Sequence, residues 1–107
     1  MSFSDKVLEK TKQIPKGKVT TYKLLAKACG NSRAGRAVGN TLNKNICSYL
    51  SNAKKNNKIP CHRVVYSDGR IGGFSKGIKR KVVLLHEEGI KVKNGRILDF
   101  ENVLFKF

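Results

Sequence analysis

The stretch TYKLLAKACGNSRAGRAVGNTLNK, residues 21–44, decides the fold. Its first part predicts a helix over about 21–29, because apolar residues recur there at helical spacing. The residues on this shared face are Tyr22, Leu25, Ala26 and Cys29. Gly30 suits the position just after a helix, so Gly30-Asn31-Ser32 predicts a tight turn. Ser32 is then expected to cap a following helix.

That second helix is expected over about 33–44. Its inward face follows the i, i+3, i+4, i+7, i+8 pattern and holds Ala34, Ala37, Val38, Thr41 and Leu42. Its other face is basic and polar, with Arg33, Arg36, Asn40 and either Asn43 or Lys44. Two helices, a glycine-containing turn and such an exposed face are typical of a helix-turn-helix. We expect a mainly α fold with a small β-hairpin, similar to a winged helix-turn-helix DNA-binding domain. The residues alone favour the major groove of DNA for the second helix.

Gly35 and Gly39 lie inside this second predicted helix, where each costs about 1 kcal/mol relative to alanine. Two explanations remain open. Another backbone, such as a DNA strand, comes close to the helix at these positions. Alternatively, the glycines allow close packing between two helices of the chain.

The charge of the chain points to a polyanionic partner. It has 107 residues with 23 Lys+Arg against 7 Asp+Glu, a net charge of +16. Nucleic acid fits this excess best, and a merely solvated basic surface is the alternative. The longest apolar run, Val82 to Leu85, is far too short to span a bilayer, and the N-terminus lacks a signal-peptide core, so no membrane partner is expected.

The cysteines indicate a reducing compartment. Cys29, Cys47 and Cys61 are odd in number and lack the spacing of a metal site. We therefore expect free thiols, no bound zinc and a cytoplasmic location.

The rest of the chain is expected to form short elements around this core. A first helix should begin at Ser2 or Ser4 and end at Pro15-Lys16-Gly17, with Phe3, Val7, Leu8, Thr11 and Ile14 on one face. Residues 45–58 are expected to form a polar loop, and Ser67 to Arg70 a turn. A fourth helix over 78–88 should turn Ile78, Val82 and Leu85 inward, with His86 as a further candidate, before an Asn94-Gly95 hairpin and a tail packed on the body.

The stretch IPCHRVV, residues 59–65, carries the candidate chemistry. Pro60 stiffens the turn before Cys61, and Val64, Val65 and Tyr66 predict a short strand. A thiol becomes a nucleophile when a neighbouring base or cation favours the thiolate, and His62 and Arg63 could supply either. The alternative is that Cys61 is only a small buried apolar residue.

Pro60-Cys61-His62-Arg63-Val64 resembles the active-site signature of the O6-alkylguanine-DNA alkyltransferases. Val19 to Tyr22, Arg33 to Asn45, Ser67, the Gly72 to Ser75 loop, Lys81 and Leu84 to Gly89 match the same family in order. The resemblance covers the whole chain. It implies one DNA-binding and catalytic domain over 1–107, with the helix-turn-helix at about 21–44, the active-site turn at 59–65 and a glycine-rich loop at 69–77.

The resemblance implies direct-reversal DNA repair. An alkyl group would pass irreversibly and once per molecule from O6-alkylguanine, with O4-alkylthymine a further candidate, to Cys61. No cofactor is needed, because the thiolate attacks the alkyl carbon directly. The substrate would be double-stranded DNA whose damaged nucleotide is flipped out, approached from the minor groove by a monomer.

The resemblance also assigns roles to single residues. Cys61 would be the alkyl acceptor, His62 its base acting through a water, Glu88 the orienting carboxylate, and Asn45 the link to the helix before it. The substrate-binding residues would be Tyr22, Val64, Ser75 and Lys81, with Tyr22 and Ser75 donating to guanine. The DNA-binding residues would be Thr21, Arg33, Arg36, Gly39, Asn40 and Lys44, with Arg36 filling the gap left by the flipped nucleotide.

Some positions depart from the family pattern. Ile46 stands where proline is usual, and the segment from Asn45 to Cys61 is long, so Asn56 or Asn57 is a rival for the role of Asn45. Phe74 replaces a tyrosine, and Lys76 replaces a small or apolar residue. The change at Lys76 bears on the width of the alkyl pocket.

Two other functions compete. Alkyltransferase-like proteins bind the lesion without transfer, but carry another residue, often tryptophan, where Cys61 stands. A helix-turn-helix transcription regulator would use the second predicted helix but would not need Cys61, His62 and Glu88 together.

Overall fold

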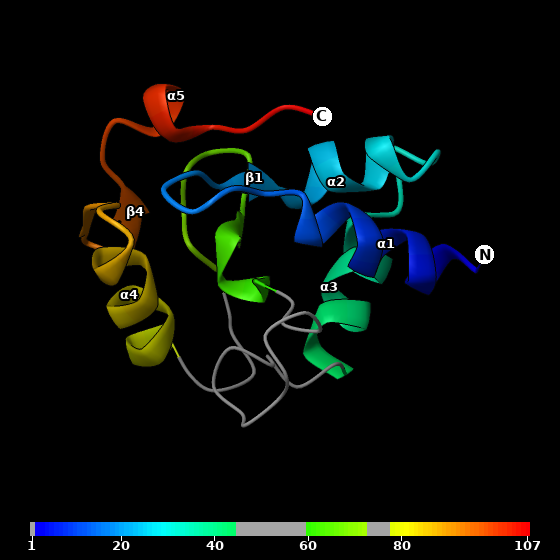
Figure 1. The fold of residues 1–107 in the computed structure, drawn as a ribbon, viewed down its shortest axis with the longest axis horizontal. Coiled ribbons are helices and arrows are strands. Elements are labelled where there is room, and N and C mark those ends of the chain that lie inside the picture. Colours follow the sequence, from blue (N-terminus) through cyan, green and yellow to red (C-terminus); the bar gives the residue numbers. More distant parts are fainter. Residues whose placement is uncertain (1, 45–59, 73–77) are drawn as a thin grey trace.

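The computed structural model describes residues 2–44, 60–72 and 78–107 (Figure 1). It is mainly α-helical with a small hairpin, as predicted. The elements, in order, are α1 (Phe3–Lys12), β1 (Thr20–Thr21), α2 (Tyr22–Ala28), α3 (Gly35–Lys44), the 3₁₀ turn η3 (Cys61–Arg63), β2 (Val64–Val65), α4 (Ile78–Glu87), β3 (Val92–Lys93), β4 (Arg96–Ile97) and α5 (Phe100–Val103). In this described part, no helix has the length and apolar character needed to cross a membrane.

Helix α1 begins with a reciprocal cap. The Ser2 hydroxyl accepts from the backbone N–H of Asp5, and the Asp5 carboxylate accepts from the N–H of Ser2. The predicted inward face is confirmed, with Val7, Thr11 and Ile14 buried. The helix ends at Lys12, before the proline that the sequence placed as its boundary.

Helices α2 and α3 form the predicted helix-turn-helix. Thr21 caps α2 through its side chain, which accepts from the N–H of Leu24 at 3.0 Å. Helix α3 begins at Gly35, so the prediction that Ser32 caps it was wrong. The turn continues further because Asn31 holds it: its side-chain oxygen accepts from the N–H of Arg33, and its carbonyl accepts from Ala34.

The buried face of α3 is narrower than its sequence pattern predicts. Val38 and Leu42 are buried, but Ala37 is exposed, so its inward placement was wrong. The helix packs on α1 and α2 along one stripe only. A small residue at the edge of that stripe therefore faces solvent.

Strands β1 and β2 pair in parallel, although they lie far apart in the sequence. Thr20 pairs with Val64 and Thr21 with Val65. The predicted strand including Tyr66 is shorter, and Cys61 starts a 3₁₀ turn rather than a strand. The turn forms because the N–H of Arg63 donates back to the carbonyl of Pro60 at 3.0 Å.

Helix α4 buries a lysine in place of an isoleucine. Lys81 has no exposed surface, whereas Ile78 is 55% exposed, and His86 is also exposed. The predicted inward placement of Ile78 and His86 was therefore wrong, while Leu85 is buried as expected. Lys81 can be buried because its ammonium donates to two backbone carbonyls.

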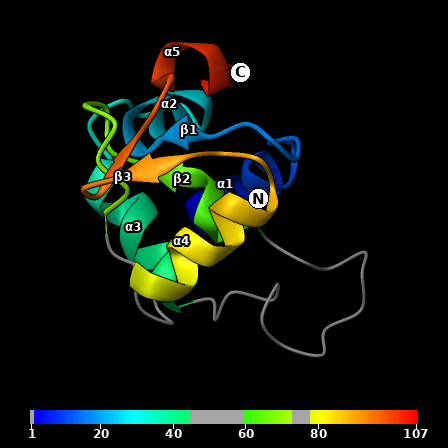
Figure 2. The ribbon, with the colours of Figure 1, turned by 90° about the vertical axis from the view of Figure 1, so that its left-hand side faces the viewer.

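The hairpin and the tail match the predictions. Asn94 and Gly95, with φ of 53° and 75°, form the turn between β3 and β4. The tail returns along β1: the N–H of Val19 donates to the carbonyl of Val103, and the N–H of Phe105 donates to the carbonyl of Val19. In Figures 1 and 2 this segment passes close to β1 and α2.

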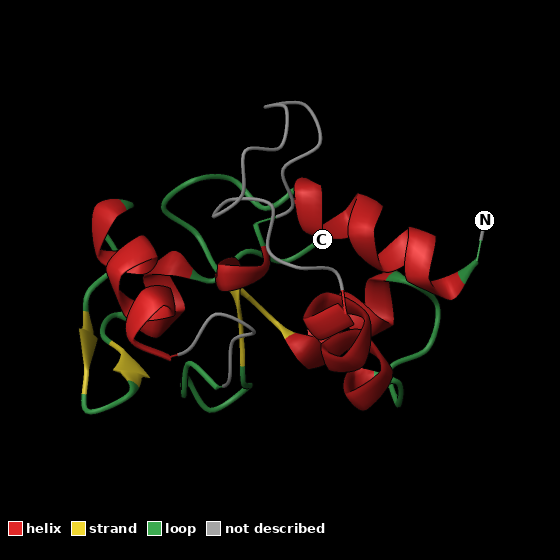
Figure 3. Cartoon of the chain, turned by 90° about the horizontal axis from the view of Figure 1, so that it is seen from below, coloured by secondary structure: helices red, strands yellow, loops and turns green. Residues whose placement is uncertain are grey.

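Two apolar clusters meet at η3 and β2. One joins α1, α2 and α3 and includes Cys61 and Val64; the other lies under α4 and the hairpin and includes Val65. Figure 3 shows the helices in two groups on either side of this central segment. The segment around Cys61 is therefore fixed by both halves of the molecule.

Candidate active site

The thiol lies inside the molecule. Cys61 is the first residue of η3, and only 6% of it is exposed. Neither Cys61 nor Cys29 is part of a disulfide, and Cys47 lies outside the described residues. The next residue, His62, is completely buried. A buried imidazole beside a buried thiol needs a partner that fixes its orientation.

That partner is Glu88, which follows the last residue of α4. The distance from His62 Nε2 to Glu88 Oε2 is 3.1 Å, and the carboxylate side chain is 6% exposed. Residues 26 positions apart in the sequence are thus joined by an ion-pair contact in the interior. The structure thus brings together two of the predicted catalytic residues, with His62 placed as the base and Glu88 as the carboxylate that orients it.

Arg63 holds the same carboxylate from the other side. Its Nε donates to Glu88 Oε1 at 2.9 Å, a second guanidinium N–H donates to Oε2, and a third donates to the carbonyl of Ile14 at 2.9 Å. The sequence suggested that Arg63 supplies charge to the thiol. The structure instead uses it as a two-pronged clamp on Glu88.

These contacts keep Glu88 ionised. Burial alone would raise the pKa of its carboxyl, but hydrogen bonds and charges from Arg63 and His62 outweigh burial and lower the pKa to about 2. Glu88 is therefore an anion at every physiological pH. An anion at this position favours the imidazolium that His62 becomes when it takes a proton.

Lys81, on α4, contacts the backbone of β2. Its ammonium donates to the carbonyl of Val64 at 2.8 Å and to that of Ile71. Burial lowers its pKa to about 7, and the opposing influence of Cys61 is the next largest cause. The thiol and the lysine therefore affect one another electrostatically, and a protonated Lys81 favours the thiolate.

Tyr22, the first residue of α2, is a neutral hydrogen-bonding group. Burial raises the pKa of its phenol to about 12, with smaller contributions from Tyr66 and Cys61. It also lines a cavity of about 500 Å³. Tyr22 thus connects that cavity to the surroundings of the thiol.

The cavity lies where the parallel strands β1 and β2 end, against residues of α3 and the turn before it. Its lining residues are Tyr22, Lys23, Ser32, Gly35, Arg36, Gly39, Asn40, Tyr66 and Ser67. A volume of about 500 Å³ lies within the usual range for a site that binds a small molecule or a nucleotide. Its basic members belong to the helix-turn-helix.

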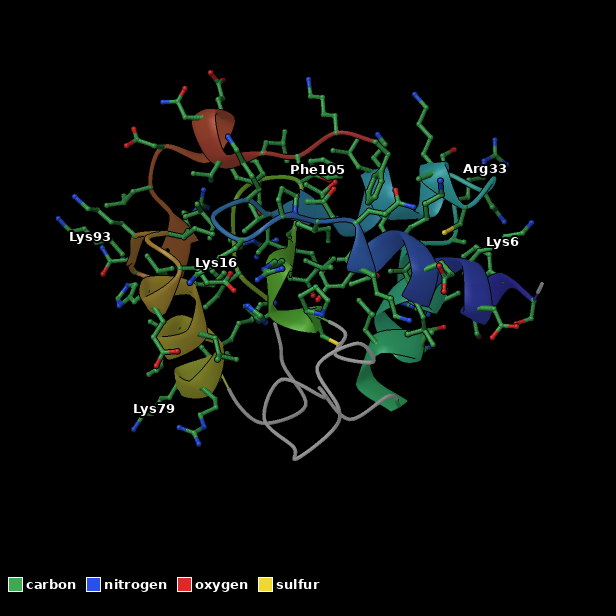
Figure 4. All side chains as sticks on the ribbon, in the orientation of Figure 1. Lys6, Lys16, Arg33, Lys79, Lys93 and Phe105 are labelled. Atoms are coloured by element: carbon green, nitrogen blue, oxygen red, sulfur yellow. The ribbon has the colours of Figure 1, made fainter. Side chains whose placement is uncertain are left out.

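Several predicted DNA-binding residues gather at this cavity. Arg36, Gly39 and Asn40 line it from α3, while Arg33 projects from the turn before that helix (Figure 4). Thr21 is buried and caps α2, and Lys44 is the last residue of α3. Asn45 and Ser75 lie outside the described residues, as do Ile46, Asn56, Asn57, Phe74 and Lys76.

Tyr66 and Lys23 were not predicted from the sequence as cavity residues, nor was Arg63 predicted as the clamp on Glu88. The signal for Tyr66 was an aromatic residue directly after two buried valines. Nothing local in the sequence showed that Tyr66 would lie beside Tyr22, because that depends on the parallel pairing of β1 and β2.

Comparison with known proteins identifies the family. Residues 2–90 match the family described as "6-O-methylguanine DNA methyltransferase, DNA binding domain". The chain belongs to this family. The match spans α1 to α4, and so includes the helix-turn-helix, η3 and Glu88.

Two relatives show how similar the chain is to known proteins. The chain is 47% identical over 85 residues to the bifunctional methyltransferase/endonuclease of Picrophilus torridus, covering 79% of the chain and 26% of that protein. It is 43% identical over 90 residues to a methylated-DNA–protein-cysteine methyltransferase of Saccharolobus islandicus, covering 84% and 52%. The chain thus spans about half the length of this methyltransferase, or less for the bifunctional protein.

A solved structure of S. pombe Atl1, in complex with damaged DNA containing O6-carboxymethylguanine, has the same fold over nearly its full length. Its TM-score is 0.77, with 29% identity over 98% of this chain and 95% of that chain. The arrangement of the elements in this chain is therefore similar to that of a protein whose structure was solved with damaged DNA.

Proposed function

We propose that this chain repairs alkylated DNA by direct reversal, moving an alkyl group from O6 of guanine to Cys61 once per molecule. The observation that carries the proposal is the buried contact of His62 with Glu88, next to Cys61 in the chain. Thiol, base and orienting carboxylate form the set that activates a nucleophile in cysteine enzymes. They lie in a domain of the 6-O-methylguanine DNA methyltransferase family.

The chemistry balances without a cofactor. The Cys61 thiol gives its proton to His62 through a water, and the thiolate attacks the alkyl carbon. The new S–C bond forms as the C–O6 bond breaks, and the bonding electrons stay on guanine, which remains part of the DNA. The proton held by His62 returns through water to guanine, so neutral guanine is restored. Tyr22 and Ser75 donate to guanine and its O6, which makes guanine a better leaving group.

DNA is the proposed substrate carrier because basic and amide side chains of α3 line the cavity. Cys61 cannot reach the alkyl carbon on O6 while the base is stacked inside the duplex, so the damaged nucleotide has to leave the stack. Arg36 would occupy the gap, and α3 would lie in the minor groove, where Gly39 allows close approach. The remaining DNA contacts proposed are Thr21, Arg33, Asn40 and Lys44.

In this proposal residues 1–107 form one DNA-binding and catalytic domain, which acts in the cytoplasm. It is supported by the position of the η3–β2 segment, which belongs to both apolar clusters. Asn45 is proposed to tie the end of α3 to this segment, and Val64 and Lys81 to form its inner wall. The contact from Lys81 to the carbonyl of Val64 is consistent with that role.

A second candidate is a protein that binds the lesion without removing it. The likeness to S. pombe Atl1, whose solved structure holds damaged DNA containing O6-carboxymethylguanine, extends over nearly the whole of both chains and favours this alternative. Cys61 distinguishes the two, because a binding protein needs no nucleophile at this position.

Intact-mass measurement after mixing with an O6-methylguanine duplex decides between them. Transfer predicts one added methyl group, located on Cys61 by peptide mapping, and a reaction that stops at one equivalent. An unchanged mass despite tight, lesion-selective binding would identify a binding protein. Modification of Cys47 or Cys29 instead would show that the assignment of Cys61 is wrong.

The Cys61→Ser variant is the matched control for this measurement. It replaces only the sulfur with oxygen, and serine is a far weaker nucleophile without thiolate character. It should bind the lesion duplex and gain no mass.

A further inference from the structure

The register of the parallel strands places two tyrosines side by side. Thr21 pairs with Val65, so the residues that follow them, Tyr22 and Tyr66, leave the strand pair together. Their ring centroids lie 5.3 Å apart with an angle of 49° between the planes. The separation lies within the range of interacting aromatic pairs, and the angle is intermediate between the offset-stacked and edge-to-face arrangements. Both rings line the cavity beside α3.

The ring of Tyr66 has a prepared seat. A Cβ at Gly72 would lie 2.8 Å from Cε2 of Tyr66, so the ring rests directly against glycine backbone. Gly72 also has a φ of 72°, which other residues rarely adopt. The absence of a side chain at Gly72 is therefore what leaves room for the tyrosine.

Arg70 supports the same ring. Its guanidinium carbon lies 5.4 Å from the ring centroid, within the range of a cation–π contact. Asp68 holds that guanidinium by a 2.7 Å contact, and the N–H of Tyr66 donates to the carbonyl of Arg70 at 2.8 Å. The order of the contacts is Asp68, Arg70, Tyr66 and Tyr22, leading from the surface turn to the cavity.

Tyr66 remains 46% exposed despite these contacts. A large aromatic ring left half open and yet held by its neighbours contributes less to the core than a buried ring does. Its placement serves Tyr22, whose ring it contacts at the wall of the cavity.

We propose that Tyr66 is a positioning residue that holds the phenol of Tyr22 in place for the damaged nucleotide. This inference rests on the proposed function, because it takes Tyr22 as the donor to guanine. Tyr66 contributes its ring and not its hydroxyl. Phenylalanine should therefore replace it, and alanine should not.

A double-mutant cycle in the Cys61→Ser background tests this role without requiring transfer. The quantity measured is the ratio of affinities for an O6-methylguanine duplex and the same duplex with guanine. Tyr22→Phe should lower this ratio about 3- to 10-fold, the usual effect of one lost hydrogen bond. Tyr66→Ala should lower it by a similar or smaller factor, and Tyr66→Phe should leave it unchanged.

The decisive variant combines Tyr22→Phe with Tyr66→Ala. If Tyr66 acts through the Tyr22 hydroxyl, the double variant should match Tyr22→Phe alone, because the hydroxyl is already gone. Multiplied effects would mean that Tyr66 touches the DNA by itself and would overturn the positioning role. No effect of Tyr22→Phe, or none of Tyr66→Ala, would also overturn it.

Phe107→Ala provides the matched control. Phe107 is 42% exposed and packs edge-on against Phe105 at 5.0 Å, but does not line the cavity. It should leave the affinity ratio unchanged while costing similar packing. Thermal unfolding of each variant separates a loss of positioning from a loss of fold.

The outcome of the cycle and that of the proposed function are independent. Transfer is read from the mass of the protein with Cys61 intact. An unchanged mass with the expected cycle would leave Tyr66 as a positioning residue in a lesion-binding protein. Transfer with a multiplicative cycle would confirm the repair activity and reject the role of Tyr66.

Discussion

The carboxylate of Glu88 serves two partners at once. His62 contacts one oxygen, while Arg63 clamps both. A buried charge is tolerated only when it is paired and hydrogen-bonded, and here each group depends on the other two. Removal of one member would leave the rest with uncompensated charge. Glu88, His62 and Arg63 therefore form a structural unit, and two of them, Glu88 and His62, also belong to the proposed catalytic set.

Glu88→Gln should slow methyl transfer by about tenfold or more, because the amide cannot stabilise the imidazolium of His62. Single-turnover kinetics on an O6-methylguanine duplex measure this. Transfer at the wild-type rate would show that Glu88 has no role in the reaction. Arg63 still donates to the amide oxygen, so the fold should persist.

The same variant makes a prediction about acid stability. The pKa of Glu88 is lowered from 4.5 to about 2, so its ionised form stabilises the fold above pH 4.5 and that stabilisation is lost as the pH falls towards 2. Glu88→Gln should therefore be less stable than the wild type at pH 6, with a difference that shrinks below pH 4.5. Urea unfolding across this range measures the difference. A constant difference would contradict the lowered pKa.

Lys81 should produce a pH dependence of the same sign, but in the neutral to alkaline range. Its folded pKa of about 7 lies below the ordinary 10.5, so the unfolded chain holds more protons between these values. The free energy of unfolding from this group therefore rises with pH between about 7 and 10.5. Lys81→Met should flatten that rise. The exposed Lys79→Met, on the same helix, is the control and should leave the slope unchanged.

The elements show what the sequence could predict. Helix α1 and the Asn94-Gly95 turn follow from local signals, a reciprocal cap and a dipeptide suited to positive φ. The pairing of β1 with β2 does not, because each strand has two residues and the partners lie far apart. Nothing local shows the seat of Tyr66 or the clamp of Arg63, since both depend on that pairing and on the position of α4.

Lys81 shows a second limit. Periodicity places apolar residues inward, and therefore favoured Ile78 over a lysine on α4. The structure buries the lysine because carbonyls of Val64 and Ile71 are within reach of its ammonium. Hydrogen-bond acceptors supplied by distant backbone cannot be read from the helix itself. The resemblance to the family marked Lys81, whereas the hydrophobic pattern did not.

Gly39 of α3 is suited to a test of whether glycine is needed there for helix packing or for the approach of DNA. A Cβ at Gly39 would lie 3.8 Å from the ring of Tyr22, an ordinary contact, so packing within the described chain does not require glycine there. Gly39→Ala should therefore raise the free energy of unfolding by about 1 kcal/mol. It should also weaken DNA binding, because the methyl group projects into the cavity wall.

Ala37 provides the reverse control on the same helix. It is exposed, so Ala37→Gly should destabilise the fold by about 1 kcal/mol through helix propensity alone. DNA affinity measured at a temperature where both variants are fully folded separates an effect on DNA binding from an effect on stability. A destabilised Gly39→Ala would favour the alternative, in which glycine is needed for packing between helices.

At the scale of the whole molecule, positive charge is not confined to the helix-turn-helix. In Figure 4, Lys6 and Arg33 project from one end, and Lys79 and Lys93 from the other. A net charge of +16 on 107 residues attracts DNA to the molecule in many orientations. Productive docking then needs a residue whose contribution is not merely charge, and Arg36 is the candidate because it lines the cavity.

Arg33 and Arg36 should therefore respond differently to alanine. Arg33→Ala removes the proposed phosphate contact, so it should lower the affinity for unmodified duplex. It should also reduce by about one the slope of the logarithm of the binding constant against the logarithm of the salt concentration. Arg36→Ala should lower the rate of transfer from duplex DNA much more than it lowers affinity for unmodified duplex. The reason is that filling the gap in the stack matters only after the nucleotide has been flipped out.

A substrate that needs no flipping separates the two roles. Free O6-benzylguanine and single-stranded DNA have no stack to be filled, so the rate defect of Arg36→Ala should largely disappear on them, while Arg33→Ala keeps its salt-dependent defect on the single strand. If Arg36 were one more phosphate contact, both variants would lose duplex binding and duplex transfer in parallel, with equal changes in salt slope. Rates and affinities over a salt series, on duplex and single strand, distinguish a residue that attracts DNA from one that replaces a base within it.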